Sequence, residues 1–152
     1  MSIRSLGIAV MAAVVACAGM AIAAPAGKLV EITGNDQMKF SVTSITAKPG
    51  ELLHVRLKSV GTLPKIAMAH NFVLLAKGTD ATAFTNASAT ASTTGYIPGQ
   101  FKAKVLASTA LVGPGETVDV TFNAPAAPGQ YTYLCSFPGH FVAGMKGLLV
   151  VK

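Results

Sequence analysis

Apolar and polar residues alternate along several short stretches of the chain. The alternation is strict in TVDVTFNA (117–124) and clear in the centre of LLHVRLKSV (52–60), as expected for strands with one buried face. Turn signals, KPGE (48–51) and GPGE (113–116), lie between such stretches. Further strands are predicted at 28–33, 38–47, 70–76, 103–112, 131–135 and 147–152. Many short strands separated by Pro and Gly favour an all-β sandwich or barrel.

One stretch departs from this pattern. Residues 79–95 (TDATAFTNASATASTTG) are rich in Ala, Thr and Ser, and Phe84 is their only large apolar residue. The pattern is typical of a short helix capped by Asp80, or of a loose flap. We expect this flap, at about residues 79–100, to lie outside the sandwich.

The beginning of the chain predicts export. A basic start, MSIR, precedes the uncharged run SLGIAVMAAVVACAG and the small residues AIAA, which is the pattern of a secretory signal peptide with cleavage after Ala23. The run is too short to predict a membrane span. A lipoprotein signal ending at Cys17 is the alternative, and it alone would attach the protein to a membrane. We therefore expect residues 24–152 to form one domain in the periplasm or another extracytoplasmic space.

The charge balance narrows the class of partner. The chain has 12 Lys and Arg against 6 Asp and Glu, a balance that favours acidic partners. The lysines are scattered, without a basic run or interleaved aromatic residues, and this distribution argues against nucleic-acid binding.

Candidate metal-ligating residues are concentrated in CSFPGHFVAGM (135–145), which holds Cys135, His140 and Met145. If the signal peptide is removed, Cys135 has no cysteine partner, and an exported lone thiol suggests metal binding. One cysteine cannot hold an iron–sulfur cluster, and structural zinc sites use paired Cys or His. One Cys, two His and a weak Met match a mononuclear blue-copper site.

The spacing within this segment has a mechanical rationale. A strand ending at Cys135 can be followed by a tight Pro138–Gly139 turn that returns His140 beside the cysteine. Met145 would then approach from another direction. The second histidine must be His54 or His70. His54 lies in the middle of a strand, whereas His70 opens a strand after a loop, so His70 is the better candidate.

The sequence also resembles a known family. GNDQMKF (34–40), LPKIAMAHNFVL (63–74) and the last 18 residues (135–152) resemble the azurin and auracyanin group of the cupredoxins. The resemblance implies a Greek-key β-sandwich with one copper ion at one end. It implies that His70, Cys135 and His140 are strong ligands and that Met145 is a weak axial ligand. It also implies that Asn71 ties the two ligand loops together and that the Phe137 N–H donates to the Cys135 sulfur.

Some positions depart from the azurin pattern. The His140–Met145 spacing is that of auracyanins and plastocyanins. Ala69 stands where azurins have a glycine whose carbonyl is a distant fifth copper contact, so a contact from the Ala69 carbonyl stays open. Phe72 replaces a tryptophan, and the family's disulfide is absent from this sequence.

The function expected from this resemblance is transfer of single electrons by Cu(II)/Cu(I) cycling, without catalysis. The expected partners are cytochromes or copper or haem reductases with acidic docking surfaces. Copper delivery is the main alternative, and a cysteine-nucleophile enzyme and a metal-free structural sandwich are others. We expect an apolar docking patch around His140, formed by Met38, Met68, Pro138, Phe141 and Val142.

Overall fold

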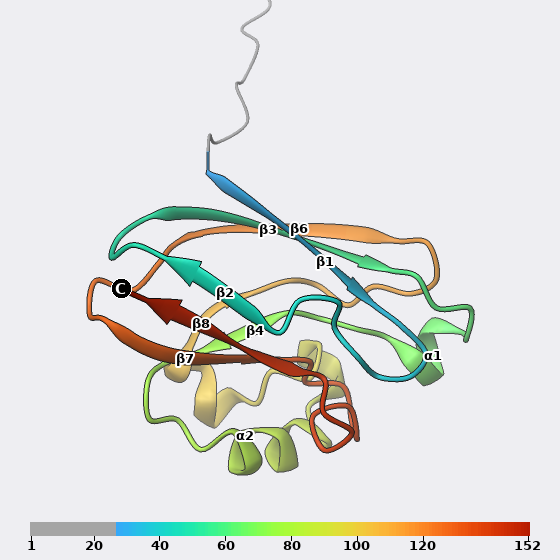
Figure 1. Ribbon diagram of the computed structural model, residues 1–152. Coiled ribbons are helices and arrows are strands. Elements are labelled where there is room, and N and C mark those ends of the chain that lie inside the picture. Colours follow the sequence, from blue (N-terminus) through green and yellow to red (C-terminus); the bar gives the residue numbers. More distant parts are fainter. Residues whose placement is uncertain (1–26) are drawn as a thin grey trace, which may run out of the picture.

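Two β-sheets pack face to face in the computed structural model, which describes residues 27–152 (Figure 1). The three-stranded sheet has the order β1 (Lys28–Gly34), β3 (Leu52–Ser59), β6 (Thr117–Asn123). The five-stranded sheet has the order β2 (Ser44–Ala47), β8 (Lys146–Val151), β7 (Gly129–Leu134), β4 (Val73–Leu75), β5 (Val105–Ser108). The pairs β1–β3 and β2–β8 are parallel and the others are antiparallel. The predicted β-sandwich is confirmed, and the described sheets do not close into a barrel.

Alternation along the strands sorts their side chains between the core and the surface. On β3, Leu53, Val55 and Leu57 are fully buried between the sheets. His54 and Arg56 point outward, where their side chains lie 2.7 Å and 2.9 Å from an Asp119 oxygen. Each buried aliphatic side chain of this kind contributes about 1.5–3 kcal/mol. His54 is therefore part of a surface ion cluster on the three-stranded sheet.

Three predicted strands are shorter than expected. The strand expected at 103–112 is reduced to β5, because residues 103–104 belong to a 3-10 turn. In 38–47, strand β2 begins only at Ser44; Met38 adopts a left-handed backbone with a φ of 56°, and Phe40 makes an isolated bridge with Gly34. The Asn35 side chain accepts from the N–H groups of Gln37 and Lys39 and keeps this segment a loop. In 70–76, β4 begins at Val73, and His70 instead makes an isolated antiparallel bridge with Val112.

Short helices cover part of the sandwich. The helix α2 (Ala81–Ser88) begins at Asp80, whose carboxylate accepts from the N–H groups of Thr82 (2.9 Å) and Ala83 (3.0 Å). The helical alternative for the flap is thus correct. Figure 1 shows α2 against the five-stranded sheet, and Phe84 packs there on β4 and β7. The flap continues through the 3-10 turns η1 (Ser92–Thr94) and η2 (Gly99–Lys104).

A further helix lies where a loop was expected. The helix α1 (Lys65–Met68) precedes His70 and has no buried residue. Before it, the Asp36 carboxylate accepts from Thr62 N and Oγ1 (2.8 and 3.0 Å). Asp36 therefore joins the 34–40 loop to the segment that leads to His70.

The predicted signal peptide (1–23), including Cys17, lies outside the described residues. Within residues 27–152, no helix is both long enough and apolar enough to cross a membrane.

Replacing Asp80 by Ala tests the flap cap. Loss of the two N–H contacts should lower the free energy of unfolding by about 1 kcal/mol, measured by urea denaturation. Asp80→Asn is the control and should retain most of the stability, because an amide oxygen can also cap. Equal losses in both variants would show that the cap geometry does not matter.

Candidate metal centre

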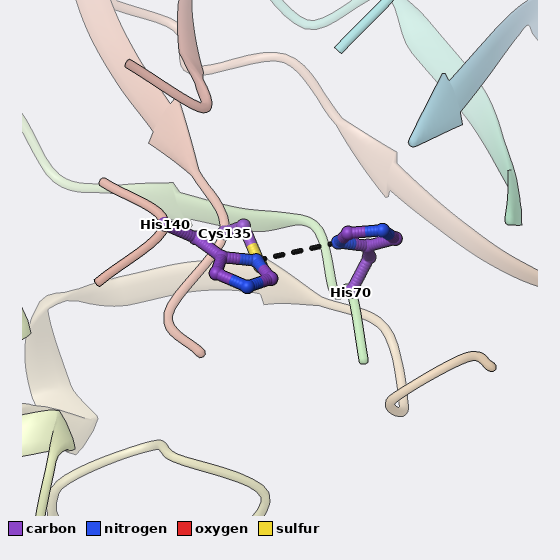
Figure 2. A group of neighbouring side chains, drawn as sticks. All are labelled: His70, Cys135 and His140. Carbon is purple, nitrogen blue, oxygen red and sulfur yellow. Dashed lines mark hydrogen bonds between the residues drawn. The ribbon is translucent and has the colours of Figure 1, made fainter. Parts of the chain in front are cut away.

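Three side chains from two distant segments converge at one end of the sandwich. Figure 2 shows His70 facing the pair formed by Cys135 and His140. The Nδ1 atoms of the two histidines are 3.3 Å apart, and Cys135 Sγ lies 3.4 Å from His140 Nδ1. All three residues are buried, with exposed fractions of 0–2%. The predicted His70–Cys135–His140 cluster is thus brought together by the fold.

The loop after β7 has the turn expected from its sequence. The His140 N–H donates to the Phe137 carbonyl (3.1 Å), and Gly139 has a φ of 84°. Pro138 followed by a glycine at positive φ matches a type II turn. The loop then closes, since Met145 N–H donates to His140 O (2.9 Å) and Cys135 N–H to Met145 O (3.1 Å). These bonds set Cys135, His140 and Met145 around one point.

Met145 is fully buried beside the histidine of the other segment. A Cβ atom placed on Gly34 would lie 2.8 Å from both the Met145 methyl carbon and His70 Cδ2. Any larger residue at position 34 would therefore displace one of them. Sequence reasoning missed this role of Gly34, although the glycine opens the GNDQMKF segment.

The Cys135 sulfur is fully buried, and a few polar backbone groups lie around it. The backbone N–H groups of Asn71 and Phe137 donate hydrogen bonds to it, and the Ala69 carbonyl oxygen is 3.9 Å away. Burial raises the pKa of the Cys135 thiol to about 12, because the thiolate loses its hydration, and the two N–H donors oppose this rise only in part. The Phe137 N–H was expected from the sequence, whereas the Asn71 N–H was not.

Burial also determines the protonation state of the two histidines. It lowers the pKa of His70, and it lowers the pKa of His140 to about 4, with repulsion from His70 as a smaller cause. Both rings are therefore neutral at pH 7 and can offer a lone pair to a metal. His70 Nε2 is buried and has no hydrogen-bond partner among residues 27–152.

Asn71 connects the two ligand segments. Its side-chain oxygen accepts from Ser136 N (2.8 Å), and its amide nitrogen donates to Ser136 Oγ (2.8 Å) and Gly95 O (3.2 Å). Asn71 follows His70, and Ser136 follows Cys135. These bonds join the segment that carries His70 to the loop that carries Cys135, and the partners Ser136 and Gly95 are additions that only the fold reveals.

The spacing of the donor atoms fits one metal ion. Two nitrogen ligands at 2.0–2.1 Å from a metal, with tetrahedral to trigonal angles, are roughly 3.3–3.6 Å apart. The His70–His140 nitrogen distance is 3.3 Å, and all three donor atoms lie within 4.8 Å of one another. One thiol, two imidazoles and a nearby thioether are the donor set of a mononuclear copper site.

Residues 26–152 match the profile of a family described as "Copper binding proteins, plastocyanin/azurin family". The chain belongs to this family. Azurin-1 of Alcaligenes xylosoxydans xylosoxydans is 42% identical to the chain over 123 residues, which cover 79% of this chain and 94% of that protein. Auracyanin-B of Chloroflexus aurantiacus is 38% identical over 117 residues, which cover 76% of this chain and 48% of that protein.

Solved cupredoxin structures share the fold. Auracyanin A of Chloroflexus aurantiacus, described as a "blue" copper protein, has a TM-score of 0.72 and 33% identity, over 82% of this chain and 98% of that one. An azurin of Methylomonas sp. strain J has a TM-score of 0.72 and 31% identity, over 84% and 99%. The predicted family, copper cofactor and electron-transfer function are confirmed by these relatives together with the buried cluster.

The residues expected in the cupredoxin docking patch lie near the ligand loop with different exposures. Val142 is 84% exposed and Pro138 is exposed, whereas Met38, Met68 and Phe141 are partly buried. Phe141 packs toward the flap, with the Lys146 ammonium 4.4 Å from its ring centroid. Sequence reasoning missed the exposed apolar side chains of Leu63 (44%) and Ile66 (91%) in and before α1.

Copper binding by this cupredoxin should release about one proton per ion at pH 7. The proton comes from Cys135, because the high pKa keeps the thiol protonated and the low histidine pKa values leave both rings neutral. The apparent affinity should therefore rise about tenfold per pH unit between about pH 6 and 9. The number of protons released is measured from the pH change after each small addition of Cu(II) to a weakly buffered solution. Two or more protons per ion would mean that a histidine is protonated in the metal-free protein.

Proposed function

We propose that His70, Cys135 and His140 are the strong ligands of one copper ion, that Met145 is its weak axial ligand, and that the protein carries single electrons through this site. The observation that carries the proposal is the convergence of one buried sulfur and two neutral imidazoles, whose donor atoms all lie within 4.8 Å of one another. When bound, copper supplies the Cu(II)/Cu(I) couple.

The chain's own residues would keep the ligand positions fixed in both oxidation states. Asn71 holds the two ligand loops together through Ser136, and the N–H groups of Asn71 and Phe137 stabilise negative charge on the Cys135 sulfur. Hydrogen bonds to a ligating thiolate tune the potential of such a site. The Ala69 carbonyl oxygen lies 3.9 Å from this sulfur, and this proximity supports its proposed role as an additional weak contact.

The alternatives fit the cluster less well. A cysteine nucleophile needs a lowered pKa and access to substrate, whereas the Cys135 thiol is fully buried and its pKa is raised to about 12. A copper-delivery protein must release its ion to a partner, and ligands with exposed fractions of 0–2% do not favour that transfer. Enclosure of the ion suits an electron carrier.

Export is part of this proposal. The sequence of residues 1–23 supports a cleaved signal peptide, with lipidation at Cys17 as the alternative. We infer that residues 24–152 act as the mature carrier in the periplasm or another extracytoplasmic space.

A visible absorption spectrum of the mature domain during Cu(II) titration tests the ligand assignment. We expect an intense blue band that saturates at about one copper per chain and bleaches reversibly on reduction, as a Cys-thiolate copper site requires. Cys135→Ser should abolish the band. His54→Gln is the matched control and should retain it, because His54 lies on the outer face of the sheet. A wild-type protein without the band, or one that loses copper on reduction, would contradict electron transfer at this site.

We infer that redox partners dock on the apolar surface around the ligand loop. Exposed Pro138 and Val142 belong to that loop, and exposed Leu63 and Ile66 precede the other ligand segment. Met38, Met68 and Phe141 would border this surface. Weak redox encounters use small interfaces of this kind.

Two lysines beside this surface favour an acidic partner. Lys39 donates to the Ala143 carbonyl, and Lys146 lies over the Phe141 ring, so both flank residues 141–144. Neither forms an ion pair within residues 27–152, whereas Lys65 is neutralised by Glu116 at 2.6 Å. A cytochrome or a copper or haem reductase with carboxylates around its docking site would complement this charge.

The variant Ile66→Lys tests the docking surface. A charge at this position should slow electron self-exchange between two copies about tenfold, because the encounter must then desolvate it (tenfold is about 1.4 kcal/mol). The rate is read from NMR line broadening in mixtures of oxidised and reduced protein. Leu29→Lys is the matched control. Leu29 is an exposed apolar residue at the start of β1, whereas Gly34, at the end of β1, lies beside His70 and Met145. An equal decrease in both variants would reflect net charge alone and would contradict docking at α1.

A further inference from the structure

The flap reaches the metal centre at the Gly95–Tyr96 turn, which contacts Asn71 and Phe137. We propose that Tyr96 is a positioning residue, which fixes the Phe137 ring and through it the ligand His140. In this interpretation the flap is part of the copper site, not only a cover for the sheet. The inference rests on the ligand assignment proposed above, but its first test needs no copper.

The backbone at this turn is strained and tightly held. Gly95 and Tyr96 both lie in the left-handed region, with φ angles of 64° and 63°. This conformation is uncommon for a residue with a side chain and is a genuine outlier for a bulky one. Hydrogen bonds maintain it, from Gly95 N to Ser92 O (3.1 Å) and from Tyr96 N to Ala91 O (2.8 Å). Backbone strain of this kind persists where the surroundings over-determine it, often at functional sites.

The Tyr96 side chain lies at the start of a continuous aromatic contact. Its ring meets the Phe137 ring edge-on, with centroids 5.0 Å apart and an interplanar angle of 65°. The Phe137 ring in turn lies 4.8 Å from the His140 ring, and the His140 ring lies 5.1 Å from His70. The Tyr96–Phe137 pair is edge-to-face, whereas the two pairs that involve His140 are tilted, with interplanar angles of 45° and 47°. Aromatic rings at such distances attract one another, so each ring limits the movement of the next.

The same turn is also held by the other ligand segment. The Asn71 amide donates to the Gly95 carbonyl (3.2 Å), directly before Tyr96. Phe137 lies between the ligands Cys135 and His140, and Asn71 follows the ligand His70. The Gly95–Tyr96 turn therefore contacts both loops that supply ligands.

The consequence concerns the freedom of His140. Its ring has Phe137 on one side, and Phe137 is half-buried, with part of its side chain packed on the hydrophobic core. Tyr96 is the neighbour that the flap supplies to the Phe137 ring. With Tyr96 in place, the imidazole keeps one orientation whether or not a metal is bound, and little rearranges when an electron arrives or leaves.

Three variants separate this role from general stability. Tyr96→Ala removes the ring, and Tyr96→Phe keeps it. Phe101→Leu is the matched control, because Phe101 packs edge-on against Phe84 within the flap, with centroids 5.5 Å apart. Phe101→Leu should loosen the flap but keep the contact between the Tyr96 and Phe137 rings. If Tyr96→Ala does not fold, Tyr96→Leu serves instead, since it keeps apolar volume but no aromatic edge.

The first readout is the NMR signal of the His140 ring in the metal-free protein. We expect Tyr96→Ala to broaden or double this signal, and Tyr96→Phe and Phe101→Leu to leave it single. The second readout is electron self-exchange of the copper-loaded protein, which should fall about tenfold in Tyr96→Ala only, because small misplacements of a reacting group are costly.

A His140 signal and an exchange rate in Tyr96→Ala equal to those of Phe101→Leu would overturn the inference. A wild-type protein without a blue band would instead refute the ligand assignment, while the metal-free NMR comparison would still decide whether Tyr96 positions His140.

Discussion

The hydrogen bonds of Asn71 are the interaction on which the metal centre depends. One buried amide holds the His70 segment to the Cys135 loop through Ser136 and to the flap through Gly95. Without the Asn71 oxygen, the buried Ser136 N–H would lose its partner, at a cost of about 1–3 kcal/mol. The sheets bring the two loops to the same end of the sandwich, but this amide fixes the spacing between the donor atoms.

Burial sets the protonation states of the donor residues before a metal ion binds. It disfavours the charged forms of all three donors, so the histidines are neutral and the cysteine is a thiol. Only the cysteine must change its protonation when copper binds. The N–H groups of Asn71 and Phe137 already point at the sulfur and stabilise the thiolate that then forms. Folding has thus prepared the ligand geometry in advance, as expected for a rigid electron carrier.

The sequence predicted those parts of the fold that follow from local chemistry. Alternation located β6 and the centre of β3, Asp80 located the start of α2, and Pro138–Gly139 predicted the turn that returns His140 to Cys135. Other features depend on contacts between distant segments. The late start of β4 follows from the His70–Val112 bridge, whereas the loop before β2 is a local feature held by the left-handed backbone at Met38. The need for Gly34 appears only when His70 and Met145 lie beside it.

The burial of Cys135 also determines the fate of the protein before it acquires copper. The chain holds a single cysteine in its described part, and that thiol is fully enclosed. Oxidation and disulfide exchange require an accessible thiolate. Complete burial and a pKa of about 12 keep Cys135 in the unreactive thiol form. A freshly folded, metal-free molecule can therefore wait in an oxidising environment without forming covalent dimers or a sulfenic acid, and it keeps its ligand intact until the ion arrives.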